Sequence, residues 1–255
     1  MNPGEHQVMA EVEADHWWYR GLRDVLLRTI RRFGAGLPER PRVLDAGCGT
    51  GQNLAALGGW LRPAYLGGFD VSELALELAR EKVPQADLYA ADICNPQLRE
   101  TGFDLVVSLD VIYIPGAEQS LAGLQQIVAA MHPGGLFVVN LPAYDWLYSE
   151  HDVAIHTSER YTATRVRTLL QALDLEVELM TYRLCALFPL VVLSRLPSLL
   201  RARPSDSEAH SDLHDVPAET LNRTLYAAVR AENAAIARGI RLPFGSSVYA
   251  IGRKT

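Results

Sequence analysis

The sequence has few cysteines and no extended run of basic residues. Its three cysteines, Cys48, Cys94 and Cys185, are too few and too scattered for a disulfide framework, and no pair has the spacing of zinc ligands. This favours a cytoplasmic protein with reduced thiols and no metal site. A net charge of −6 without clustered cations argues against a nucleic-acid partner, because phosphate groups are bound by grouped Lys and Arg. We expect a monomer or homodimer that binds a small neutral or cationic molecule.

Long apolar runs are also missing. The first 20 residues carry acids and no apolar core, so a secretory signal is not expected there. The stretch LCALFPLVVL at 184–193 has ten residues, whereas a membrane span needs about 20. We interpret it as a core or pocket-covering helix. An amphipathic element that contacts a membrane is the less favoured alternative, because Arg195, Arg201 and Arg203 follow it.

Short apolar runs alternate with helical patterns from Arg42 onward. Continuous apolar runs indicate strands buried on both faces, which is typical of a parallel sheet covered by helices. Ser72 and Thr162 are expected to begin two of the helices. An insertion between the last two strands contains an acidic loop at 204–217 and a helix from about 218 to 240. The predicted strands are 42–46, 65–70, 87–92, 103–112, 134–142, 175–184 and 246–254, and the predicted helices among them are 51–61, 72–82, 117–131 and 162–173.

Three glycines, Gly47, Gly49 and Gly51, directly follow the first of these strands. Glycine lets a backbone turn sharply or come close to a ligand where a Cβ would collide. The spacing is G-x-G-x-G and not the G-x-G-x-x-G of dinucleotide sites. Asp45 precedes the glycines, and a buried acid there would repel a pyrophosphate but would suit a cationic amine.

Acids also end the next two strands. Asp70 is placed to accept both hydroxyls of a ribose, the role that an acid has in dinucleotide folds. Asp92 lies one strand further along, where it can accept from the exocyclic amine of a purine, with Val71 and Ile93 as apolar faces for the ring. The sequence therefore predicts a ligand with a ribose, an adenine and a positively charged end.

These residues carry a resemblance to a known family. VLDAGCGTG, the strand-end Asp70, AADI and MHPGGLFVVNLPA together resemble the class I S-adenosylmethionine-dependent methyltransferases, over about residues 42–173. The resemblance implies an α/β fold with a Rossmann-like, mostly parallel sheet of seven strands and helices on both faces. It implies a helical cap at 1–38 and a methyltransferase domain at 39–255, with 184–243 as a substrate-covering insertion.

The cofactor that the resemblance implies is S-adenosylmethionine. Asp45 and the loop backbone would hold its methionine part, and the stretch from Leu109 to Val111 would pass its sulfonium end. A similar Trp-rich N-terminal helix lies over the cofactor in related sequences, so Trp17, Trp18 and Tyr19 of DHWWYRGLR would close the pocket. Core packing of that helix is an equal alternative. The implied cofactor-binding residues are Asp45, Gly47, Cys48, Gly49, Gly51, Asp70, Val71, Asp92, Ile93, Leu109 and Tyr19.

A polar cluster after the fifth strand is the candidate acceptor site. A subset of the family has an S-x-H-D…H…R-Y segment here, and this chain has LPAYDWLYSEHDVAIHTSERYT. A histidine with a near-neutral pKa is a natural general base, and a carboxylate can orient it. We predict His151, Asp152 and His156 as catalytic; capping of the next helix with loop salt bridges is the structural alternative, and a metal site is a third. The predicted substrate-contacting residues are Tyr113, Tyr144, Arg160 and Tyr161.

Tyr113 can equally be an ordinary buried loop residue. The related pattern tends to have His directly after it, whereas this chain has Ile114, which shifts the expected base to His151 or His156. The function predicted from all these residues is methyl transfer to the O, N or C atom of a small, apolar molecule, such as a secondary metabolite or a lipid-like intermediate. A cofactor-binding enzyme that catalyses a cyclisation or rearrangement is the alternative, and a silent binding protein is disfavoured by the three intact acids.

Overall fold

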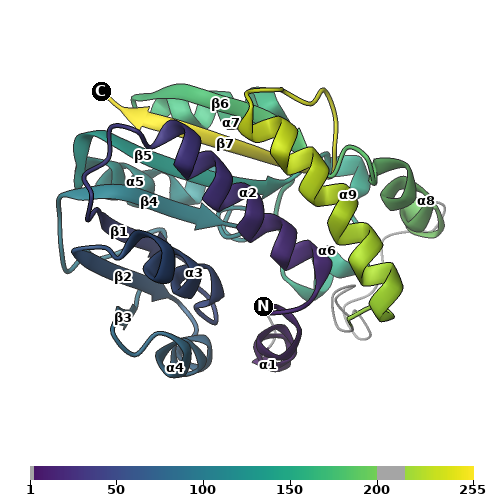
Figure 1. Cartoon of the computed structure of the whole chain (residues 1–255), viewed down its shortest axis with the longest axis horizontal. Helices are drawn as coiled ribbons and strands as arrows, with labels where there is room; N and C mark the ends of the chain where they lie inside the picture. Colours follow the sequence, from purple (N-terminus) through teal and green to yellow (C-terminus); the bar gives the residue numbers. More distant parts are fainter. Residues whose placement is uncertain (1–2, 200–215) are drawn as a thin grey trace.

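The computed structural model describes residues 3–199 and 216–255, apart from the side chains of 3–5, 151 and 196–199. One seven-stranded sheet, in the order β3-β2-β1-β4-β5-β7-β6, runs through these residues (Figure 1). The strands β1 to β5 pair in parallel, and β7 is antiparallel to both β5 and β6. The predicted fold class is confirmed. The strands are β1 (Arg42–Ala46), β2 (Tyr65–Asp70), β3 (Asp87–Ala90), β4 (Phe103–Leu109), β5 (Met131–Pro142), β6 (Leu175–Arg183) and β7 (Ser247–Lys254).

Each central strand is buried on both faces, which explains its continuous apolar sequence. Successive side chains point to opposite faces of the sheet, so Leu105 and Val107 of β4 join one core cluster and Val106 joins the other. Helices α2 (Trp17–Phe33), α3 (Gln52–Leu61), α4 (Glu73–Lys82) and α9 (Glu219–Ala237) pack on the first face. Helices α5 (Ala117–Ala129) and α7 (Ala163–Ala172) pack on the second.

The two predicted helix starts are confirmed. Ser72 accepts a hydrogen bond from the backbone N–H of Ala75, and Thr162 accepts one from that of Arg165. Three short elements, namely α1 (Pro3–Val12), η1 (Asp145–Leu147) and α6 (Glu150–Ala154), lie outside the regular alternation of strands and helices.

The predicted insertion contains two helices, α8 (Phe188–Leu199) and α9. Helices α9 and α2 lie side by side across the sheet (Figure 1), where Asn233 Nδ2 donates to the carbonyl of Gly21 at 2.8 Å. Most of the predicted acidic loop at 204–217 lies outside the described residues. Within the described part of the chain, no helix has the length and apolar character needed to cross a membrane.

Strand order reverses between β1 and β4, and this reversal determines where the site forms. From β1 the chain proceeds outward to β2 and β3, and then returns to β4 on the other side of β1. Ligands of such sheets bind in the crevice at the carboxyl ends of the strands on either side of the reversal. The loops after β1 and β4 meet there.

Candidate active site

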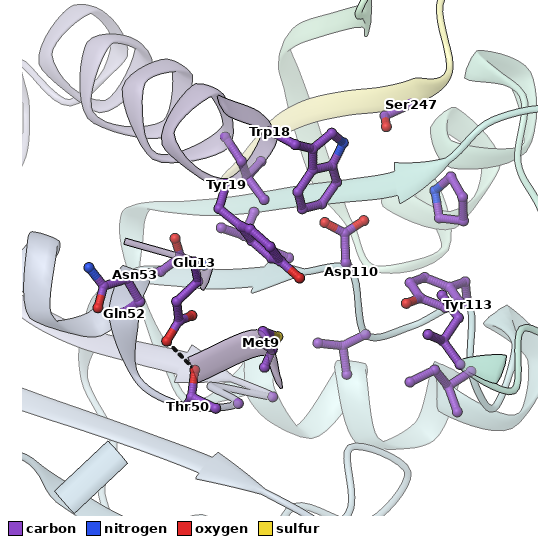
Figure 2. Close-up of a pocket in the computed structure, with 18 of the residues that line it drawn as sticks. Met9, Glu13, Trp18, Tyr19, Thr50, Gln52, Asn53, Asp110, Tyr113 and Ser247 are labelled. Atoms are coloured by element: carbon purple, nitrogen blue, oxygen red, sulfur yellow. Dashed lines mark hydrogen bonds between the residues drawn. The ribbon is translucent and has the colours of Figure 1, made fainter. Parts of the chain in front are cut away.

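A cavity of about 720 Å³ lies at the carboxyl ends of β1, β2 and β4, a size typical of small-molecule sites (Figure 2). Its walls come from the loops after these strands and from α1, α2 and α8. The cavity contains nine of the eleven predicted cofactor residues, all except Asp45 and Gly51, in its lining.

The glycine loop turns sharply enough to press its backbone against the neighbouring strand. The N–H groups of Gly47 and Cys48 both donate to the carbonyl of Phe69 on β2 at 2.9 Å. Gly47 has a φ of +86°, and a Cβ at this position would lie 2.3 Å from Cγ2 of Val111. Only glycine fits between the loop and Val111, so the sharp turn predicted from the sequence has a steric cause at this position.

Asp45 lies at the end of β1 behind this loop. Its side chain is 2% exposed, and among the residues that the structure describes its Oδ2 atom has no hydrogen-bond partner. Burial raises the pKa of Asp45 to about 7, and the nearby charge of Asp70 contributes to the rise. An unpaired buried carboxylate is costly, and a cationic amine that reached it would remove that cost.

The acids at the ends of β2 and β3 face the cavity and organise their own loops. Asp70 accepts from the N–H groups of Gly49 and Ser72, both at 2.9 Å. Asp92 accepts from the N–H of Cys94 at 2.8 Å. A carboxylate has about four acceptor positions, so both keep capacity for ligand hydroxyls or amines.

An apolar surface lies beside these acids. Val71 is 76% exposed even though it is fully apolar, and Ile93 is buried but also lines the cavity. An exposed apolar side chain in a cavity wall is a suitable contact for a flat aromatic ring.

The N-terminal helices cover the cavity. Thr50, within the glycine loop, donates its hydroxyl to Glu13 at 2.5 Å (Figure 2). Glu13 also pairs with Lys82 of α4. Trp18 and Tyr19 of α2 pack edge to face with ring centroids 5.0 Å apart, and both line the cavity. Two helices that come early in the chain are therefore attached across the site.

His16 is a lining residue that the sequence analysis did not select. Its Nδ1 accepts from the N–H of Trp18 at 3.2 Å, and burial lowers the pKa of His16 to about 4. The imidazole is therefore neutral near pH 7, with its proton on Nε2.

Of the predicted acceptor residues, Tyr113, Asp152 and Arg160 line the cavity. His156 is exposed and is not part of the lining. The side chain of His151 lies outside the described residues. Two predicted substrate contacts also lie elsewhere: Tyr144 stacks on Tyr182 with centroids 5.3 Å apart, and Tyr161 belongs to the core.

Asp152 and Arg160 form a buried ion pair. The guanidinium donates to the two carboxylate oxygens at 2.8 and 2.9 Å, and it also donates to the carbonyl of Ala143. The N–H of Ser149 donates to the same carboxylate at 2.9 Å. Both Asp152 oxygens are therefore engaged in holding the loop after β5, as the structural alternative predicts.

A further acid, Asp110, is partly buried and lies in the cavity wall directly after β4. Asn140 Nδ2 donates to both of its carboxylate oxygens, at 2.9 and 3.0 Å. Burial raises the pKa of Asp110 to about 7, although the bond from Asn140 and the charge of Arg183 oppose the rise. The sequence analysis did not select Asp110 as a site residue. The rule that selected Asp70 and Asp92, an acid at the end of a predicted strand, misses Asp110 because the predicted strand 103–112 continues past it, whereas β4 ends at Leu109.

The sheet order, the glycine loop and the acids at successive strand ends define a Rossmann-like, nucleoside-binding α/β protein of the methyltransferase type. Comparison with known proteins agrees. Residues 43–135 match the family model described as "Methyltransferase domain". Residues 43–135 therefore carry a methyltransferase domain that resembles the class I S-adenosylmethionine-dependent enzymes, whose cofactor is S-adenosylmethionine.

Curated proteins similar to this chain match it over only part of their own length. The trans-aconitate 2-methyltransferase of Variovorax paradoxus is 34% identical over 127 residues, which cover 49% of this chain and 48% of that protein. The tRNA (carboxymethyluridine(34)-5-O)-methyltransferase ALKBH8 of Macaca fascicularis is 31% identical over 146 residues, covering 57% of this chain and 21% of that protein. The chain thus spans about half or less of the length of these relatives.

Solved structures show the same fold at lower identity. A methyltransferase solved in complex with the Haloferax volcanii Trm112 activator superposes with a TM-score of 0.57 at 18% identity. That match covers 98% of this chain and 93% of the other.

Proposed function

We propose that this protein transfers a methyl group from S-adenosylmethionine to a small molecule with an apolar body. The observation that carries the proposal is a single cavity with two different ends. One end has the glycine loop, Asp70 and Asp92. The other, beyond Asp110, is walled mainly by apolar residues: Ile114, Pro142, Leu147, Ile155, Leu184 and Val191.

The residues at the first end fit the cofactor chemically. The orphaned Oδ2 of Asp45 supports an ammonium contact, and the glycine loop, with Gly47 and Gly49 in the cavity lining, would lie along the methionine part. Asp70 would accept from the ribose, and Asp92 from the adenine amine beside the exposed Val71. When bound, the cofactor supplies a methyl group activated by a sulfonium.

The chain itself contributes mainly alignment and exclusion of water. Holding two reactants in the right geometry is worth about 7 to 11 kcal/mol in favourable cases. Trp18, Tyr19 and α8 would cover the reacting centre, which strengthens the electrostatic effect of the buried acids. A small molecule is favoured over a nucleic acid because the cavity lies beneath α1, α2 and α8 and the net charge is −6.

The test is formation of S-adenosylhomocysteine together with a methylated product. Purified protein is incubated with methyl-labelled S-adenosylmethionine and a panel of aromatic and aliphatic hydroxyls, amines and carboxylates, with trans-aconitate and bulk tRNA as separate arms. We expect label on a small apolar acceptor, and loss of label with Asp70→Asn. Label in tRNA alone would refute the small-molecule proposal. Cofactor consumption without S-adenosylhomocysteine would favour a cyclisation or rearrangement instead.

A further inference from the structure

None of the proposed contacts with the cofactor explains why Asp110 lies in the cavity. It directly follows β4, and its carboxylate is directed toward the side of the cavity that Trp18 occupies (Figure 2). Its own φ is +58°, a conformation that non-glycine residues seldom adopt. This backbone conformation is energetically unfavourable, and it turns the carboxylate of Asp110 toward the site.

Two strands fix the orientation of Asp110. Asn140 on β5 is fully buried and donates its amide N–H to both carboxylate oxygens. The Oδ1 atom of Asn140 accepts from Nη1 of Arg183 on β6 at 3.1 Å, which determines which way the amide points. Arg183 is also fully buried, and among the described residues its Nε and Nη2 atoms have no hydrogen-bond partner. Its charge is therefore balanced through space, chiefly by Asp110.

Several other titratable groups of the cavity wall are committed elsewhere. Asp152 is held by Arg160, and Glu13 is paired with Lys82. His16 already uses Nδ1 as an acceptor, so its remaining ring nitrogen is a donor. Asp70 and Asp92 lie at the ends of β2 and β3, on the side of the adenosine.

The groups that face Asp110 do not compete for its role. Tyr113 follows it in the same loop, and burial together with the charge of Asp110 raises the pKa of this phenol well above its usual range. The hydroxyl of Tyr19 on α2 points into the same part of the cavity (Figure 2). Phenols that remain protonated are donors, and Arg183 cannot accept a proton.

Resting on the proposed function, we propose that Asp110 accepts the proton of the methyl acceptor, which is therefore a hydroxyl or an amine and not a carboxylate. The lone pair of the acceptor atom forms the bond to the methyl carbon. The electron pair of the carbon–sulfur bond stays on sulfur, and the acceptor proton passes to a carboxylate oxygen of Asp110 and later to water. Asn140 and Arg183 are positioning residues. A carboxylate acceptor has no proton to give and is repelled by Asp110.

The experiment compares Asp110→Asn with wild type, using Glu118→Gln on the exposed surface of α5 as the control. Calorimetry with S-adenosylhomocysteine is done first: failure of the wild type to bind refutes the proposed function itself. With binding intact, rates are measured on matched phenol, aniline and benzoate derivatives. We expect Asp110→Asn to lower kcat/KM on phenols or anilines by about 10²- to 10⁴-fold. We expect its affinity for S-adenosylhomocysteine to stay within about twofold of wild type, because an amide keeps the size and most contacts of the carboxyl group.

A second readout does not depend on finding the acceptor. The protein is labelled with carbon-13 at its aspartate carboxyl groups, and the Asp110 signal is the one that is absent from Asp110→Asn. In wild type this signal should titrate near neutral pH. It should titrate at higher pH in Arg183→Met, and should return toward wild type in Arg183→Lys, which restores the charge. If Arg183 had only a structural role, the pH at which the Asp110 signal titrates would not follow the charge of the side chain at position 183.

Three results would overturn the inference. One is wild-type turnover by Asp110→Asn, and another is a preference for the benzoate. The third is a carboxyl signal that titrates like an exposed aspartate and ignores Arg183. Each can occur while S-adenosylhomocysteine still binds, so each refutes the role of Asp110 and leaves the proposed function standing.

Discussion

Replacing Asp45 with Asn should stabilise the protein without cofactor at neutral pH. Asp45 is 2% exposed with an unpartnered oxygen, and its pKa rises from 3.8 to about 7 on folding. At about 1.4 kcal/mol per pH unit, this shift corresponds to about 4 kcal/mol. That is a large part of the stability of an ordinary domain, about 5 to 15 kcal/mol.

The sign follows from the raised pKa. Below pH about 4 the carboxyl is protonated in both the folded and the unfolded chain, so it imposes no penalty. Between pH 4 and 7 the Asp45 carboxyl ionises in the unfolded chain but stays protonated in the folded one, so the free energy of unfolding falls. Above pH 7 this loss is constant. The advantage of Asp45→Asn should therefore grow from about 1.5 kcal/mol at pH 5 to about 4 kcal/mol at pH 8.

Urea unfolding of wild type and Asp45→Asn at pH 5, 6, 7 and 8 measures this difference. Asp104→Asn is the contrasting variant, because Asp104 is buried but accepts from the N–H of Arg42 and contacts His132. Its substitution should destabilise at each pH. With S-adenosylhomocysteine the order of stability should reverse, because the ammonium group of the ligand needs the charged Asp45. Asp45→Asn should therefore bind this ligand more weakly than wild type does. A difference between wild type and Asp45→Asn that is independent of pH, or that favours wild type, would refute the reasoning.

Three further substitutions test other parts of the site. Val71→Ser should leave the melting temperature unchanged, since Val71 is 76% exposed, but should weaken S-adenosylhomocysteine binding by about 1 kcal/mol in calorimetry. Arg160→Met should cost about 3 to 5 kcal/mol in urea unfolding because it leaves Asp152 buried without its cation, and adding Asp152→Leu should recover much of the loss. Gly47→Ala should abolish S-adenosylhomocysteine-induced thermal stabilisation, and Val111→Ala should rescue it only in part, because the positive φ remains.

The parts of the structure that were predictable from sequence follow local rules. The bounds of β1 and β2 agree with the prediction because a strand buried on both faces is a continuous apolar run that ends at a glycine or an acid. Asp70 and Asp92 were identifiable for a similar reason: Asp70 ends β2, Asp92 follows the end of β3 closely, and parallel strands bring such residues to one edge of the sheet. The glycine loop was identifiable because three glycines spaced by single residues indicate a backbone that needs positive φ, and all three adopt it.

The hydrogen-bond network around Asp110 could not be predicted from local sequence rules. Asn140 and Arg183 are 43 residues apart in sequence, and they meet only because β7 inserts between β5 and β6. No local sequence pattern indicates that the last strand of the chain, β7, lies antiparallel between β5 and β6. The attachment of Glu13 to Thr50 and Lys82 has the same origin, a contact between segments that the sequence separates.

The same reasoning explains why the acceptor base was sought among histidines. A histidine has a near-neutral pKa in water, so sequence analysis favours it, whereas an aspartate becomes a neutral-pH base only through burial. Burial depends on the whole fold. Here it acts on Asp45 and Asp110 alike, raising the pKa of each to about 7.

These two acids have opposite consequences for the protein with and without its ligands. Without ligand, each holds a charge that the fold does not fully compensate, and the fold is less stable for it. In the proposed mechanism, a cationic amine at Asp45 would remove one such cost, and an acceptor proton delivered to Asp110 would remove the other at the moment of transfer. Binding and chemistry would then recover free energy that folding gave up. Substituting Asp45 should stabilise the protein and weaken its cofactor binding together, whereas an acid retained only for the fold would do the reverse.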